Sequence, residues 1–218
     1  MKIYKLSTGG HSKYAYAADY HAFEGMAFIE SVGEHQRKMI MDSWRIFPKE
    51  PGLNIAPSGS YWPDVMFCGN PLPSCFFSRK VLESLDFHRI AVKRAIPIPV
   101  GEVANTKLRM VPPPDYFVIE ALPGIRVDYA ASGFSVDMDG NPNRNAPRID
   151  PPPILQYDSA TWSGADLFCQ ANGHYGPHYL DLLGTERIKE IALKDGWTNV
   201  AFNRVRVKGV NPFTGLPE

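Results

Sequence analysis

The clearest pattern of hydrophobic and polar positions lies in residues 183–207. Three apolar residues there recur at the spacing that places one apolar stripe on a short helix: Ile188, Ile191 and Ala192. Four apolar residues further along alternate with others as in a strand, with a shift of phase near Asn203: Val200, Phe202, Val205 and Val207. This segment predicts a short helix followed directly by a strand.

The two ends of the predicted helix are also marked. Thr185 stands at the N-cap position, where its hydroxyl would accept a hydrogen bond from a free amide of the first turn. Glu186 follows in the first turn, where its charge favours the positive end of the helix dipole. Gly196 stands where a residue in the left-handed conformation commonly ends a helix. We therefore expect Gly196 to have a positive φ.

A similar, weaker pattern occurs upstream. Ser78 stands at the N-cap position, and three apolar residues form the stripe of a short helix: Val81, Leu82 and Leu85. The next positions alternate as a strand should: Ile90, Val92, Arg94 and Ile96. The two segments together predict two related helix-strand units and indicate an internal duplication.

The residues that precede the units support this interpretation. Each unit follows an aspartate and a Phe-Cys pair: Asp64, Phe67 and Cys68 before the first, and Asp166, Phe168 and Cys169 before the second. From Phe67 to Ser78 is 11 positions, whereas from Phe168 to Thr185 is 17. The second unit therefore carries six additional residues, which we place within residues 172–179.

The rest of the chain is rich in proline and in short strand-like runs. The strands expected outside the two units are residues 2–6, 38–47, 116–122, 125–129, 133–138 and 154–157. A helix is allowed across residues 101–109 and ends before the three prolines at 112–114. Because strands outnumber helices, we favour an α+β fold with a mixed or antiparallel sheet and a few short helices.

We divide the chain into four parts within one compact domain. An N-terminal segment of strands and loops covers residues 1–63, and the first unit covers residues 64–115. The second half, which contains the second unit, covers residues 116–208, and residues 209–218 form a tail.

Composition narrows the class of protein. Hydrophobic residues make up 44% and charged residues 21% of the chain, as in ordinary soluble domains. The formal net charge of zero argues against a broad basic face for nucleic acid. Three cysteines, an odd number, favour reduced thiols and the cytoplasm. No apolar run approaches the roughly 18 residues of a membrane span. We expect a cytoplasmic protein with neither nucleic acid nor membrane as its partner.

Candidate chemistry is sparse in the sequence. Cys169, His174 and His178 are of types that bind zinc, but Gly176 and Pro177 prevent a regular helix from presenting both histidines. We expect Cys169 to lie at a buried strand end, because a free cysteine behaves as a small hydrophobe. The sequence therefore predicts no metal site, no other cofactor and no assigned catalytic residue.

Several of these residues resemble a known family. The family pattern of hydroxyl residue, basic residue, helix, glycine and aromatic strand is matched by Ser78, Arg79, Leu85, Thr185, Arg187, Ile191, Gly196 and Phe202. Its middle section is similar to residues 116–122, Val127, Asp128, Ser132, Ile154, Leu155 and residues 166–168. Over roughly residues 63–207 the chain resembles immunity protein family 11 of bacterial polymorphic toxin systems, which is related to the double-CXXCG proteins.

The chain departs from that family in two ways. Asn199 stands where a glycine is usual after the helix, and neither C-x-x-C pair of the double-CXXCG relatives is present. Because these pairs are absent, the resemblance to the double-CXXCG proteins gives no reason to infer a zinc site.

The resemblance implies a non-catalytic bacterial protein that binds a cognate toxin domain in the cytoplasm and neutralises it. Such a protein needs a rigid scaffold and aromatic and polar anchors. The additional residues of the second unit and a nearby tryptophan supply them: Trp162, His174, Tyr175, His178 and Tyr179. Two alternatives stay open. One is a small cytoplasmic enzyme with a Cys/His or Asp/His site, such as Cys68 or Cys75 with His88, and the other is a structural subunit.

Overall fold

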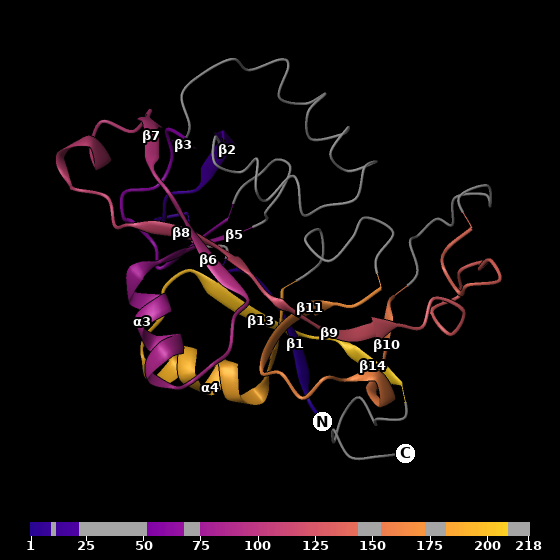
Figure 1. The fold of residues 1–218 in the computed structure, drawn as a ribbon. Helices are drawn as coiled ribbons and strands as arrows, with labels where there is room; N and C mark the ends of the chain where they lie inside the picture. The colour runs from indigo at the N-terminus through magenta and orange to yellow at the C-terminus, as the bar shows by residue number, and fades with distance from the viewer. Residues whose placement is uncertain (10–11, 22–51, 68–74, 144–153, 173–181, 209–218) are drawn as a thin grey trace.

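The computed structural model describes residues 1–9, 12–21, 52–67, 75–143, 154–172 and 182–208 (Figure 1). The strands in these ranges are β1 (Ile3–Thr8), β2 (Ala17–His21), β3 (Gly52–Ile55), β4 (Val65–Phe67), β5 (Cys75–Ser78), β6 (Arg94–Ile98), β7 (Val100–Val103), β8 (Tyr116–Glu120), β9 (Leu122–Val127), β10 (Gln156–Asp158), β11 (Leu167–Gln170), β12 (Leu183–Thr185), β13 (Val200–Arg204) and β14 (Arg206–Lys208). The helices are α3 (Arg79–Phe87) and α4 (Glu186–Lys194), with short 3-10 turns η1 (Leu108–Met110) and η2 (Ser159–Thr161). The expected α+β fold with mixed sheets is confirmed. Neither described helix is long and apolar enough to cross a membrane.

The first helix-strand segment builds a four-stranded antiparallel sheet with the order β4-β5-β8-β6. Because successive side chains of a strand point to opposite faces, its apolar residues divide between two cores. The paired residues Val65 and Phe77 face the central core, beneath the helices. Met66 and Phe76, the next pair, face a second core on the other side, which we call the outer core.

The second segment belongs to a seven-stranded sheet with the order β13-β1-β12-β11-β9-β10-β14. Its outermost strands, β13 and β14, are parts of one segment interrupted only at Val205, whose N–H donates to the carbonyl of Ile3 at 3.1 Å. The strand order therefore closes on itself through this segment. The predicted shift of phase near Asn203 corresponds to the interruption two residues later. A third core fills the inner face: Ile3, Ile125, Val127, Tyr129, Tyr157, Phe168, Leu183 and Val207.

Helices α3 and α4 lie side by side and cover the central core (Figure 1). The apolar stripes predicted for them face this core: Val81, Leu85, Ile188, Ile191 and Ala192 are all buried. A helix with one apolar face is stabilised mainly by burying that face rather than by its own propensity. The packing of two nine-residue helices on one core therefore joins the two sheets.

Strand pairing is the same around both helices. The N–H of Ser78 donates to the carbonyl of Asp64 at 2.8 Å, and the N–H of Thr185, 107 positions later, donates to the carbonyl of Asp166 at 2.9 Å. The order β4-β5-β8-β6 around α3 corresponds to the order β11-β12-β1-β13 around α4. The register corresponds as well, because β6 pairs with β8 at the positions where β13 pairs with β1.

The helix ends also correspond. Gly196 has φ +62°, which confirms the predicted left-handed residue at the end of α4. Arg89 occupies the same position after α3, 107 residues earlier, with φ +55°. Asn199 has φ +60°. Asparagine tolerates this conformation better than most residues other than glycine.

The prediction for the N-cap hydroxyl of Thr185 is wrong. Ser78 and Thr185 are the N-cap residues of the two helices, but neither side chain bonds a first-turn amide. The Ser78 hydroxyl donates to Asp64 Oδ1 at 3.3 Å, and the Thr185 hydroxyl donates to Asp166 Oδ1 at 2.7 Å. A carboxylate is a stronger hydrogen-bond acceptor than a neutral group. Because the two hydroxyls donate to the aspartate carboxylates, they are turned away from the amides of the first helical turn.

Predictions for the other elements had mixed outcomes. Strands β1, β8, β9 and β10 confirm those expected at residues 2–6, 116–122, 125–129 and 154–157. The strand expected at 133–138 is wrong, because Asp137 accepts backbone hydrogen bonds that form a turn there. The helix allowed across 101–109 is also wrong, because pairing with β3 makes its first part a strand, β7. The strand of the first unit begins only at Arg94, and residues 38–47 lie outside the described part.

Substitutions at the left-handed residues that end the two helices, Gly196 and Arg89, should have opposite effects on stability. An added Cβ at Gly196 meets nothing within 4 Å, so Gly196→Ala costs only backbone strain, about 1 kcal/mol of unfolding free energy. Arg89→Gly relieves the same strain and should stabilise the protein by up to about 1 kcal/mol. Urea denaturation measures both. A neutral Gly196→Ala, or an Arg89→Gly that destabilises, would contradict this account of the helix ends.

Candidate partner-binding surface

A three-stranded sheet, β2-β3-β7, lies against the outer core of the four-stranded sheet. Its strand β3 contributes Leu53 and Ile55 to that core, and η1 contributes Leu108. The chain reverses after β7 because Asn105 accepts from the N–H groups of Lys107 and Leu108, which is a turn stabilised by its own side chain. This turn brings η1 back beside β7.

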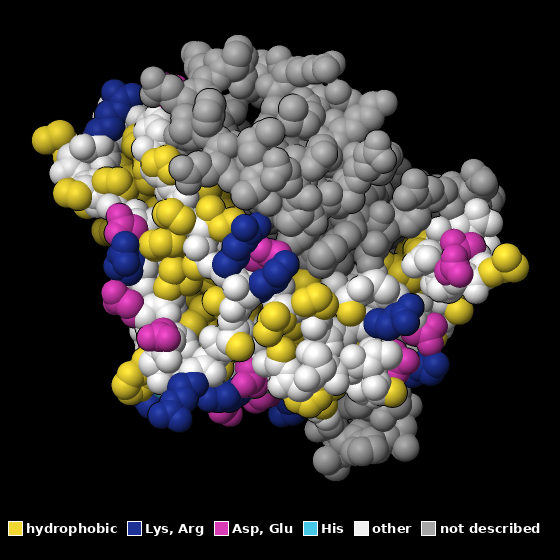
Figure 2. All heavy atoms as spheres, viewed as in Figure 1, with side chains coloured by type: hydrophobic (Ala, Val, Ile, Leu, Met, Phe, Trp, Pro, Cys, Tyr) yellow, Lys and Arg dark blue, Asp and Glu magenta, His cyan; other side chains and the backbone are white. Residues whose placement is uncertain are grey.

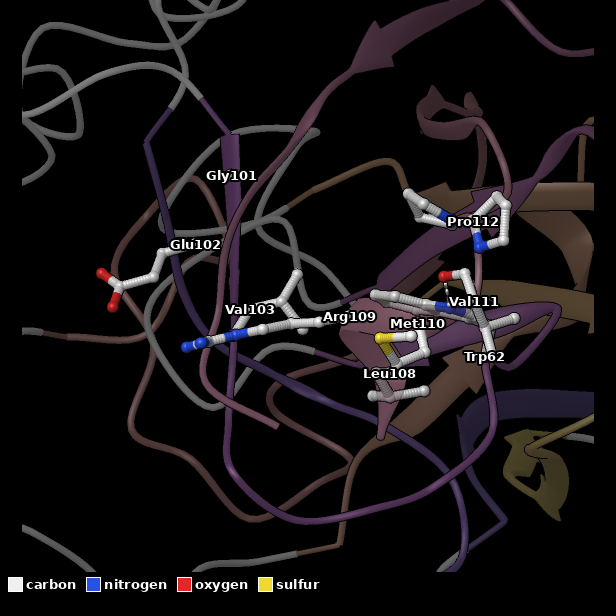
Figure 3. A pocket seen from close by; sticks show the side chains of 10 residues that line it. Trp62, Gly101, Glu102, Val103, Leu108, Arg109, Met110, Val111 and Pro112 are labelled. Atoms are coloured by element: carbon white, nitrogen blue, oxygen red, sulfur yellow. Dashed lines mark hydrogen bonds between the residues drawn. The ribbon is translucent and has the colours of Figure 1, made fainter. Parts of the chain in front are cut away.

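Between β7 and η1 lies an open groove of about 470 Å³, which we call the Trp62 groove (Figure 3). It is lined by Trp62, Gly101, Glu102, Val103, Leu108, Arg109, Met110, Val111, Pro112 and Pro113. The Trp62 Nε1–H donates to the carbonyl of Val111 at 3.0 Å, which fixes the indole against the proline segment. The groove therefore has a fixed aromatic wall.

The apolar surface of the groove is well exposed. Met110 is 85% and Val111 49% accessible, and Tyr61, next to Trp62 in the chain, is 61% accessible. In Figure 2 hydrophobic side chains gather at the upper left, where Figure 1 draws η1, and continue over neighbouring strands. Large exposed apolar side chains that adjoin one another mark binding surfaces more often than isolated ones do.

The charged residues of the groove are Glu102 and Arg109. Arg109 Nε donates to the carbonyl of Val103 at 2.6 Å. This bond holds the side chain across the groove, from η1 to β7. In Figure 3 the Glu102 side chain points away from the wall formed by Trp62 and Val111. The groove thus combines an apolar wall with one oriented cation.

The partner-binding residues expected from the sequence lie elsewhere. Trp162 follows η2, is 36% accessible, and donates from Nε1 to the carbonyl of Ala165 at 3.1 Å. The N–H of the next residue, Ser163, donates to the carbonyl of Gly124 in β9. His174, Tyr175, His178 and Tyr179 lie outside the described residues. The structure therefore places only Trp162 among these five residues.

The start of the predicted insertion is firmly attached to the fold. The Asn172 side chain pairs with Val127 in β9 as a backbone would: Oδ1 accepts from the N–H at 2.6 Å, and Nδ2 donates to the carbonyl at 2.8 Å. The Tyr129 hydroxyl donates to the carbonyl of Asn172 at 3.2 Å. These bonds lie on the β11 side of β9, whereas the bonds that attach Trp162 lie on its β10 side.

A polar cluster joins the ends of the two helices, and it bears on the enzyme alternative. Ser84 Oγ donates to Asp195 Oδ2 at 2.5 Å, and His88 Nε2 lies 3.1 Å from the same oxygen. The Trp197 Nε1–H donates to Ser84 Oγ at 3.1 Å. A serine nucleophile needs a histidine that accepts its proton, whereas this serine donates to the aspartate. The observed geometry is that of a structural network.

The two described cysteines, Cys75 and Cys169, are both buried. Burial raises the pKa of the Cys169 thiol to about 11, and its Sγ donates to the carbonyl of Ala121 at 3.8 Å. The expectation that Cys169 lies in a buried strand is confirmed by its place in β11. Among the described residues no three His, Cys, Asp or Glu side chains form a group able to hold a metal ion. Cys68, His174 and His178 lie outside that part of the chain.

Comparison with known proteins adds no assignment. Scans against protein-family models, the curated proteins and the solved structures each find no match. The surface has therefore to be interpreted from its own chemistry. Sequence reasoning missed the Trp62 groove, although Trp62 and the Met-Val-Pro-Pro run at 110–113 are the signals that would have indicated it.

The polar cluster should make stability sensitive to acid. The hydrogen bond from Ser84, with a smaller contribution from His88, lowers the pKa of Asp195. A carboxyl group whose pKa is lower in the folded state contributes stability above its unfolded pKa, about 3.9. That contribution is lost as the pH falls through the folded pKa. Asp195→Asn should therefore be less stable at neutral pH and should lose less stability than the wild type below about pH 4.

The measurement is thermal unfolding between pH 2 and pH 7, with Asp86→Asn as the control. Asp86 is an exposed carboxylate on α3, near the cluster in the chain. Parallel stability profiles for Asp195→Asn and the wild type would show that the cluster does not contribute to the acid dependence.

Proposed function

We propose that the chain is a cytoplasmic bacterial immunity protein, which binds a cognate toxin domain and neutralises it without catalysis. The observation that carries the proposal is the Trp62 groove, an exposed apolar surface held by two packed sheets. Rigid scaffolds with aromatic and methionine-rich patches are suited to binding protein partners. The resemblance of residues 63–207 to immunity protein family 11 supports the same class.

The toxin would contact two sets of residues on this scaffold. Met110 and Val111 supply the apolar set in the groove, and they are exposed enough to be truncated without opening the core. Tyr175 and Tyr179, with Trp162, His174 and His178, supply the aromatic set expected from the sequence. Binding energy usually concentrates in a few such anchors, so each set is open to test by truncation.

Truncating the groove anchors should weaken binding. We expect Met110→Ala combined with Val111→Ala to lower the affinity for the toxin by about 2 kcal/mol, in the range of hot-spot truncations. The melting temperature should change little, because both side chains are exposed. An immunity protein should be encoded next to its toxin gene, and calorimetric titration against the product of such a neighbouring gene gives the affinity. Met138→Ala is the matched control, since Met138 is fully exposed in a different loop. Unchanged affinity of the groove variant would remove the structural basis of the proposal.

A second double variant tests the aromatic residues that were expected from the sequence. Tyr175→Ala combined with Tyr179→Ala should also cost about 2 kcal/mol of binding free energy, with little effect on the melting temperature. If this variant binds normally while the groove variant does not, the interface excludes residues 172–179 and the immunity function stands.

We also propose that the two helix-strand units arose by duplication. Corresponding strand orders, registers, aspartate contacts and left-handed helix ends support this origin. Strand β1, which is third in the order β11-β12-β1-β13, comes from the start of the chain, whereas its counterpart β8 comes after β6 and β7. The present chain would then be a permuted arrangement of two equivalent halves.

A circular permutant tests this equivalence. Moving residues 1–9 behind residue 218 gives β1 the place in the chain that β8 has after β6. We expect the permutant to unfold cooperatively and to keep the far-ultraviolet circular dichroism of the wild type. A permutant that fails to fold when joined by either a short or a long glycine-serine linker would count against equivalent units.

A further inference from the structure

The edges of the described sheets are protected unequally. Unpaired sheet edges invite pairing with other chains, and native proteins usually block them. The β4 edge is covered, because the Val65 N–H donates to the carbonyl of Thr198 and Asn199 Nδ2 donates to the carbonyl of Val65. The β6 edge carries Pro97, which has no N–H to donate. The seven-stranded sheet closes through β13 and β14.

Strand β7 is different from these protected edges. It forms one edge of the sheet β2-β3-β7, contains Gly101 and no proline, and borders the Trp62 groove. Leu53 and Ile55 of β3 pair with it on one side. On the groove side, the contact given by the described residues is the bond from Arg109 to the carbonyl of Val103. An extended segment of another chain can lie along such an edge.

Arg109 specifies the charge of that segment. Three other arginines of the described chain, Arg79, Arg94 and Arg187, form ion pairs with carboxylates. Arg109 instead bonds a neutral carbonyl through Nε, and no carboxylate of the described residues pairs with it. Its guanidinium is thus oriented in advance, and it forms no ion pair with a described carboxylate, although Glu102 lines the same groove. A guanidinium held in this way favours a carboxylate as its ligand.

The residues next to Arg109 specify what surrounds the carboxylate. Met110 and Val111 follow it in the chain, and Trp62 forms the wall behind them (Figure 3). A ligand side chain bound beside the carboxylate therefore meets apolar atoms and an indole face.

We propose that the Trp62 groove binds an extended acidic and apolar segment of the partner protein. The segment lies along β7, places an Asp or Glu carboxylate on Arg109, and packs a neighbouring apolar side chain against Trp62 and Met110. This inference rests on the proposed function, because it takes the groove as the surface that the toxin contacts.

The test uses the full-length protein labelled with nitrogen-15 and two synthetic peptides. The first is acetyl-Val-Leu-Glu-Leu-Val-amide, and the second replaces Glu by Gln. Two-dimensional nitrogen-proton spectra follow each titration. We expect the Glu peptide to shift the Trp62 indole N–H and the amides of residues 100–111, and to bind about tenfold more tightly than the Gln peptide. A charge-assisted hydrogen bond of about 1.5 kcal/mol has this effect.

Two variants separate Arg109 from general electrostatics. Arg109→Gln should remove the preference for the Glu peptide, whereas Arg126→Gln, an exposed arginine on β9, should keep it. Equal binding of the two peptides, shifts confined to other surfaces, or no shift at 10 mM peptide (a concentration on the order of the weakest affinities of interest) would each overturn the inference.

The toxin titration distinguishes this inference from the function on which it rests. If Met110→Ala with Val111→Ala weakens toxin binding but Arg109→Gln does not, the groove is the interface and the acidic segment is wrong. If neither variant weakens toxin binding, the groove is not the interface and both proposals about it fall.

Discussion

Two aspartates with their basic partners link each helix to its own sheet and to the end of the other helix. Lys80 Nζ donates to Asp64 Oδ2 at 2.9 Å and to the carbonyl of Gly196 at 2.9 Å, at the end of the other helix. Arg187 makes the corresponding contacts, to Asp166 Oδ2 and to the carbonyl of His88, each at 2.7 Å. A cation near the last carbonyls of a helix opposes the negative end of its dipole. Each helix is thereby fixed to its own sheet and to the end of its neighbour.

This arrangement closes some faces of the described sheets and leaves another open. The helices cover one face of each sheet, so the central core is closed on both sides. The other face of the seven-stranded sheet encloses the third core, because the strand order closes on itself. The outer face of the four-stranded sheet is covered instead by a small sheet and the turn η1, whose far side stays open as the Trp62 groove. The groove therefore lies on a small sheet that packs against the outer core.

Local patterns in the sequence predicted the helices well, because apolar periodicity and a terminal glycine act over a few residues. The buried stripes of α3 and α4 and the positive φ of Gly196 are of this kind. Contacts between distant residues were missed. Thr185 bonds Asp166 rather than its own helix, and Trp62 bonds Val111, 49 residues away. Pairing with β3 likewise decided that residues 100–103 form a strand. The groove depends on these distant contacts, so local periodicity could not indicate it.

The central claim is that this scaffold binds a toxin domain through the Trp62 groove. Hydrogen-deuterium exchange of the full-length protein, alone and with the cognate toxin domain that the proposed function requires, tests it most directly. A bound partner slows amide exchange where it covers or orders the backbone. The account predicts that binding slows exchange most strongly over residues 100–111 and around Trp62. Protection confined to the helices or to the closed sheet, with residues 100–111 unchanged, would contradict it.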